Sequence, residues 1–129
     1  MDGPTETELI GVLEKFCSGF AEQDTEAVMS VFGPDPDVVV VTSEESLLRG
    51  PAQLKRFLDG YTGGATTYTW KWDRHMVRAT GSVAWLLAEG TETALTDGRV
   101  EKHPYRMTMV LVRHEDRWVL MQVHGSSPQ

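Results

Sequence analysis

The last third of the chain constrains the fold most, because it contains two long stretches with the alternation typical of β-strands. Residues 99–113 and 117–126 place apolar side chains at every second position, and Glu115-Asp116 separates the two stretches. One face of this hairpin is almost purely apolar, and the other mixes apolar and polar side chains. A sheet with two such faces meets a different partner on each side. We therefore expect one face to line a core or cavity and the other to meet a second subunit.

Three helical patterns precede or interrupt the strands. Apolar residues recur at helical spacing to about Gln23 behind a Thr5–Glu8 capping box, Asp24 can cap a second short helix, and Gly50-Pro51 opens a third. Strand-like segments cover residues 38–42, 46–49, 66–78, 82–96, 99–113 and 117–126. This order predicts an α+β fold in which the helices cover one side of a curved sheet.

Length and charge limit the possible classes of protein. The chain has 129 residues, enough for a single domain over 1–129, and its net charge of −7 disfavours binding to nucleic acid or to an anionic membrane. No apolar stretch approaches the ~20 residues that cross a bilayer, and the first residues do not resemble a signal peptide. Cys17, the only cysteine, excludes an internal disulfide. We expect a cytoplasmic protein.

Turn chemistry predicts which side chains share a face. Asp97-Gly98 is a strong signal for a two-residue type I′ turn, which would pair Glu92 with His103 and Gly90 with Tyr105. A three-residue loop over 79–81 would pair Trp70 with Gly90. A two-residue turn at Thr80-Gly81 would instead turn the aromatic side chains of the 66–78 segment to the other face. In the last hairpin we pair Leu111 with Val119, because this register keeps one face wholly apolar.

The predicted inner face is rich in aromatic and methionine side chains. Such residues form adaptable apolar walls, and ligand sites are mostly apolar with few polar groups. The face could equally be simple core beneath the helices. If it is a pocket, the expected ligand is a small apolar or partly polar organic molecule. Its expected wall consists of Tyr68, Trp70, Trp72, Tyr105, Met107, Met109 and Met121.

The predicted outer face is too apolar for open water on a small monomer. Tryptophan and arginine among mixed polar groups are typical of a protein interface. We expect a homodimer through this face, although a terminal segment could cover it instead. The expected interface residues are Trp85, Arg106, Trp118, Leu120, Gln122 and His124.

Glu92 and His103 are the candidate catalytic residues. As cross-strand neighbours on the inner face they could form an acid–base pair, with Tyr105 as a hydrogen-bond donor. The alternative is a weak, solvent-exposed salt bridge near the Asp97-Gly98 turn. Asp73 and His75 repeat the acid–histidine theme but should face outward or lie in a bulge. The sequence contains no metal-ligand spacing or phosphate-binding glycine loop, so we expect neither metal nor cofactor.

The chain resembles the SnoaL-like branch of the nuclear-transport-factor-2-like superfamily. The resemblance rests on the element order, the closing motif from Arg117-Trp118 to His124-Gly-Ser126, the helix start Gly50-Pro-Ala-Gln-Leu and the pair Arg106-x-Thr108. The closing motif is also similar to the calcium/calmodulin-dependent kinase II association domain. The resemblance implies a cone-shaped fold, with three N-terminal helices packed on a strongly curved, mostly antiparallel sheet, and a dimer through the outer face.

The resemblance implies several possible functions, because members of this superfamily include isomerases, dehydratases, cyclases and oligomerisation modules. The steroid isomerases use an aspartate where this chain has residues 38–41, and a tyrosine where it offers Phe16 and Phe20. Their acidic oxyanion donor falls near Thr108 or Met109. These differences argue against steroid isomerase chemistry. The expectation is a small-molecule-binding protein that is either a cofactor-free acid–base enzyme or a non-catalytic binding or association module.

Overall fold

The computed structural model describes residues 6–42 and 47–127. Helix α1 (Glu6–Ala21) and the short helix α2 (Thr25–Met29) come first, followed by the small strands β1 (Val39–Val41) and β2 (Leu47–Arg49). Helix α3 (Gly50–Thr62) leads into four long strands: β3 (Thr66–Thr80), β4 (Val83–Thr96), β5 (Arg99–His114) and β6 (Arg117–Ser126). The expected α+β fold with a curved sheet is therefore confirmed. The proposed Thr5 cap and residues 43–46, which include the first residue of the expected strand over 46–49, lie outside the described residues.

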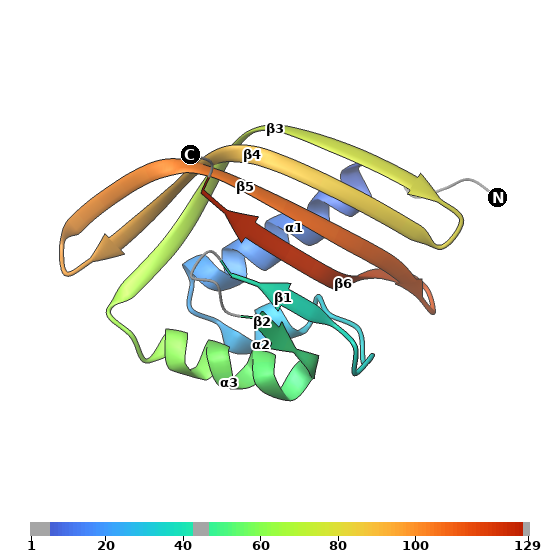
Figure 1. Cartoon of the computed structure of the whole chain (residues 1–129), viewed down its shortest axis with the longest axis horizontal. Helices are drawn as coiled ribbons and strands as arrows, with labels where there is room; N and C mark the ends of the chain where they lie inside the picture. Colours follow the sequence, from blue (N-terminus) through green and yellow to red (C-terminus); the bar gives the residue numbers. More distant parts are fainter. Residues whose placement is uncertain (1–5, 43–46, 128–129) are drawn as a thin grey trace.

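The strands form one sheet in the order β2-β1-β6-β5-β4-β3, in which only the β1–β6 pair is parallel within the described residues. Figure 1 shows that the long strands curve over α1, while α3 lies near β1 and β2 at the other end of the molecule. The core fills the space between the concave face and the helices. Leu9 and Leu13 of α1, Leu54 of α3, and Leu111 of β5 are all buried there.

Local sequence signals explain the helix boundaries. The Asp24 side chain caps α2 by accepting a hydrogen bond from the Ala27 amide at 3.1 Å. Pro51 stands at the start of α3, where its missing N–H costs nothing, and Gly50 adopts a φ of +83° that favours glycine. None of the described helices has both the length and the apolar character to cross a membrane.

The β4–β5 hairpin has the predicted register. Asp97 and Gly98 both have positive φ, as a type I′ turn requires, and Glu92 pairs with His103 while Gly90 pairs with Tyr105. This agreement follows from local chemistry, because a two-residue turn of this type leaves no freedom in the pairing of its flanking strands.

The predicted β3–β4 register is wrong by two residues. The turn is Gly81-Ser82, and an irregularity at Asp73 inserts one extra residue, so that Trp70 pairs with Glu92 and Trp72 with Gly90. Without the bulge, the aromatic side chains would point to the outer face, because one residue of shift reverses a strand's faces. Gly90 permits the bulge: a Cβ there would collide with the Lys71 carbonyl and the Trp72 Cα.

The predicted β5–β6 register is also wrong. Leu111 pairs with Leu120, and a second irregularity leaves Met121 as the extra residue before Gln122 pairs with Val110. The two-residue turn at Glu115-Asp116 determines the first part of this register, and the bulge corrects the second part so that Val123 still faces inward. Keeping one face wholly apolar was therefore the wrong criterion for this hairpin.

Candidate functional site

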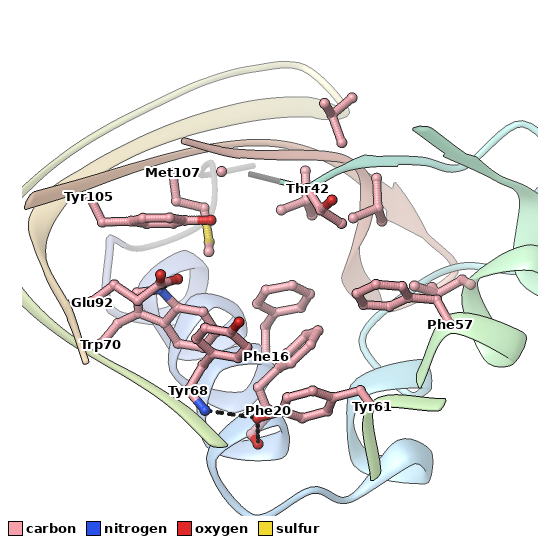
Figure 2. A pocket seen from close by; sticks show the side chains of 15 residues that line it. Phe16, Phe20, Thr42, Phe57, Tyr61, Tyr68, Trp70, Glu92, Tyr105 and Met107 are labelled. Carbon is pink, nitrogen blue, oxygen red and sulfur yellow. Dashed lines mark hydrogen bonds between the residues drawn. The ribbon is translucent and has the colours of Figure 1, made fainter. Parts of the chain in front are cut away.

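A partly open pocket lies between the concave face of the sheet and helices α1 and α3 (Figure 2). Its volume is about 80 Å³. Every major layer of the fold contributes to it, from the two helices to strands β1 and β3–β6. The lining residues are Phe16, Phe20, Val40, Val41, Thr42, Leu54, Phe57, Tyr61, Tyr68, Trp70, Glu92, Tyr105, Met107, Val123 and Gly125.

Glu92 is the charged residue among the lining residues that the structure describes. Its side chain is only 5% exposed, so the carboxylate is nearly removed from water. Trp70 Nε1 donates a hydrogen bond of 2.9 Å to Oε2, and His103 Nε2 lies 2.8 Å from Oε1. A buried charge needs such partners, because desolvation without them is costly. Two neighbouring strands therefore orient this carboxylate at the wall of an apolar pocket.

His103 lies behind Glu92 and does not line the pocket. Its side chain is 37% exposed, in contrast to the buried carboxylate that it contacts. The pair is thus neither fully buried nor the solvent-exposed salt bridge that the sequence also allowed. The imidazole therefore contacts both the buried Glu92 carboxylate and solvent.

Aromatic side chains form a continuous run along the pocket wall. Tyr61 donates a hydrogen bond to the Phe20 carbonyl and accepts one from the Tyr68 amide, both at 2.9 Å, as Figure 2 shows. Burial raises the pKa of Tyr61, its hydrogen bond with the Tyr68 backbone lowers it in part, and the negative charge of Glu92 raises it again. The Tyr61 hydroxyl therefore stays protonated and ties α1, α3 and β3 together.

Tyr105 and Met107 extend the wall onto β5. The Tyr105 ring centroid is 6.2 Å from that of Trp70, and both side chains border the space beneath the sheet (Figure 2). Gly125 makes this position possible, since a Cβ there would overlap the Tyr105 side chain. Tyr68, Trp70, Tyr105 and Met107, which were predicted to form one wall, thus line this pocket.

Trp72, Met109 and Met121 do not line this pocket, contrary to the prediction. Met109 is fully buried within the core, and Met121 is displaced by its bulge to a second pocket beside Gly33 and Pro34. Trp72 packs against the hydrophobic core, and its indole nitrogen is buried. Burial raises the pKa of the Cys17 thiol to about 12, an effect that the Trp72 indole partly offsets and the charge of Glu14 increases. This thiol is therefore unreactive at neutral pH.

The outer face differs from the prediction at two residues. Trp118 and Leu120 are buried in the core at 4% and 0% exposure, because the β5–β6 register turns both side chains inward. Their predicted place on an interface is wrong for this reason. Trp85 is 47% exposed, and Arg106, Gln122 and His124 are also exposed on the outer face.

An ion cluster also lies on the outer face. Arg106 Nε and Arg74 Nε each donate a hydrogen bond of 2.8 Å to Glu89, one to each carboxylate oxygen. These hydrogen bonds, with that of Arg106 first, hold the pKa of Glu89 below its usual range. Arg106 is therefore already paired within its own chain.

Sequence reasoning missed the helical half of the pocket. Phe16 and Phe20 of α1 and Phe57 of α3 were visible as helical apolar stripes, which by themselves predict core packing. Tyr61 follows Phe57 by four residues and so shares its face, a spacing that could have identified it. Only the packing of the two helices against the sheet shows that these rings surround a space.

The family model of the SnoaL-like domain matches residues 10–129, which is almost the entire chain. The chain belongs to the SnoaL-like domain family. Among curated proteins, none is similar enough in sequence to count as a match. The resemblance inferred from the closing motif and the element order is therefore confirmed.

Several solved structures share the fold of this SnoaL-like protein. A candidate dehydratase of the NTF2-like family from Streptomyces avermitilis has a TM-score of 0.86 at 17% identity, over 95% of this chain and 96% of that one. A candidate aromatic ring hydroxylase from Novosphingobium aromaticivorans has a TM-score of 0.85 at 18% identity, over 99% and 93%. At such identities the likeness establishes the fold alone.

A candidate calcium/calmodulin-dependent protein kinase II association domain from Xanthomonas campestris is also similar. Its TM-score is 0.80 at 17% identity, over 98% of the SnoaL-like chain and 89% of that chain. The fold thus occurs both in proteins described as enzymes and in one described as an association domain.

In the described part of this SnoaL-like chain, no group of three or more histidine, cysteine or acidic side chains lies close enough together to bind a metal ion. Asp73 lies in the β3 bulge, and His75 pairs with Ala88 on the exposed edge strand. These two residues do not join Glu92 and His103 in one site.

Proposed function

We propose that this SnoaL-like protein binds a small, mostly apolar organic molecule in the Glu92 pocket and transforms it by cofactor-free acid–base chemistry. The observation that supports this proposal best is a buried carboxylate at the wall of an aromatic pocket, bonded to a half-exposed imidazole. Ligand sites are typically apolar with a few oriented polar groups, and Glu92 is such a group.

Glu92 is the proposed proton carrier. Its carboxylate takes a proton from a carbon of the bound molecule and returns it either to another carbon, which is an isomerisation, or to a leaving hydroxyl, which departs as water. His103 is the proposed positioning residue, because its contact with Oε1 at 2.8 Å orients the carboxylate. The dehydratase description of the Streptomyces protein is compatible with the second reaction.

A thermal-shift screen tests the binding part of this proposal. Small alcohols, ketones, amines and aromatic compounds should raise the unfolding temperature of the wild type, since a ligand that binds only the folded state stabilises it. The same compounds should stabilise the Glu101→Gln variant equally, because Glu101 is an exposed residue on the same hairpin as Glu92. If no compound stabilises the protein, the pocket is only packing and the association function is favoured.

We propose in addition that the outer face forms a homodimer. Met76 and Trp85 are about half exposed there, at 57% and 47%, and Val83 is 38% exposed. An apolar patch of this kind on a small protein is characteristic of an interaction surface. A pure association module is the second candidate function, and the small volume of the pocket is the observation that favours it.

The Trp85→Asp variant should dissociate this dimer. Burying an unpaired carboxylate in place of a large aromatic residue should weaken association by about 2 kcal/mol or more. Analytical ultracentrifugation should show a dimer for the wild type and a folded monomer for the variant. Leu47→Asp is the matched control, because Leu47 is 58% exposed but lies on β2 at the other edge of the sheet. A dimeric Trp85→Asp variant would contradict this interface.

A further inference from the structure

We infer that the pocket selects an organic cation, with a substituted ammonium group bound between the aromatic rings and Glu92. This inference rests on the proposed binding function and specifies its ligand class. It is independent of whether catalysis follows. Three properties of the site support it: the nature of its walls, the sign of its charge, and its size.

The walls consist largely of aromatic rings. Seven of the fifteen lining residues are aromatic: Phe16, Phe20, Phe57, Tyr61, Tyr68, Trp70 and Tyr105. Neighbouring rings form a continuous series, with centroid separations of 5.3 Å for Phe20–Tyr61, 5.9 Å for Tyr61–Tyr68 and 6.2 Å for Trp70–Tyr105. Aromatic faces carry negative potential and attract cations, and several rings around one site recognise substituted ammonium groups.

The charge of the site has the matching sign. Glu92 is acidic and buried, and none of the described lining residues is basic. The indole N–H of Trp70 donates to the Glu92 carboxylate, which leaves the ring more electron-rich and strengthens its attraction for a cation. The net charge of −7 adds a long-range preference for cations over anions. An anionic ligand would be repelled by the Glu92 carboxylate.

The size of the pocket favours a small group. Its volume of about 80 Å³ is well below the roughly 300–1,000 Å³ of sites for drug-sized molecules. A methylated ammonium group is compact, weakly hydrated and apolar at its surface, so it suits a small aromatic pocket.

Choline and its uncharged analogue 3,3-dimethylbutan-1-ol test the inference directly, because the two differ in charge but hardly in shape. Isothermal titration calorimetry of the wild type should show choline binding about tenfold more tightly, as cation–π attraction and a carboxylate together would give. In Glu92→Gln the preference should fall to about twofold or less, because the amide keeps the shape and loses the charge. Glu101→Gln should keep the tenfold preference.

Equal binding of the two compounds to the wild type would overturn the inference, as would binding of neither. This comparison needs no variant, so it stays decisive if Glu92→Gln folds poorly. If neutral compounds stabilise the protein in the thermal-shift screen while choline has no advantage, the binding function survives and only the preference for a cation is wrong.

Discussion

We expect the Glu92→Gln variant to lose between about 100-fold and 10,000-fold in turnover once a substrate is identified, which is the usual contribution of a positioned acid or base. The amide has the same shape as the carboxylate and can still accept from Trp70, so the fold should be retained. Rates are to be measured with saturating substrate, and circular dichroism is to confirm that the variant is folded.

His103→Gln should lower turnover less than Glu92→Gln, since His103 acts through Glu92 and does not line the pocket. The double variant should be little worse than Glu92→Gln alone, because two residues that act as a unit are not additive. Glu101→Gln controls for the loss of one negative charge on the same hairpin. Full activity of Glu92→Gln would remove the carboxylate from the mechanism.

The second large effect concerns stability. Leu120→Asp should prevent folding, because Leu120 is 0% exposed and pairs with Leu111, which is equally buried. A carboxylate left unpaired in such a place costs several kcal/mol, a large part of the roughly 5–15 kcal/mol that stabilises a typical domain. Urea denaturation followed by circular dichroism should show loss of most or all of the folded baseline.

Gln122→Asp is the matched control for that experiment. Gln122 lies two residues along the same strand and is exposed on the outer face, so its variant should unfold close to the wild-type midpoint. The outer-face placement of Leu120 that the sequence suggested predicts a different outcome, a folded monomer. If Leu120→Asp gave a stable, folded monomer, this result would support the outer-face position of Leu120 and contradict the β5–β6 register of the structure.

The sequence predicted the part of the sheet in which turn chemistry determines pairing. Asp97-Gly98 defines the β4–β5 register, so the contact between Glu92 and His103 followed from a single local signal. Strand β3 was placed incorrectly because its turn is Gly81-Ser82, and β6 because its register was chosen from the apolar pattern of one face. Each strand also contains a bulge, which depends on tertiary packing. Gly90 was a usable signal for the first one, since an isolated glycine in a strand often marks a bulge or a close approach of backbones.

The candidate site was predictable only in its sheet half. Trp70, Tyr105 and Met107 alternate along strands, so their common face could be inferred even with a wrong partner register. The depth of the site could not be inferred, because it depends on how far α1 and α3 stand from the sheet. For the same reason the burial of Glu92 was left open: its position near a hairpin end also allowed contact with water, whereas the curved sheet and the aromatic rings enclose it.

The four tryptophans offer the most direct test of the Glu92 pocket as a ligand site. The Trp70 indole lines the pocket and bonds to Glu92. Trp72 and Trp118 have buried indole nitrogens outside the pocket lining, and Trp85 lies on the outer face. With ¹⁵N-labelled tryptophan, NMR titration with choline and with the compounds found by thermal shift should move the Trp70 indole signal most and leave that of Trp85 unchanged. Movement of Trp85 alone, or of no indole signal, would contradict the assignment of this pocket as the functional site.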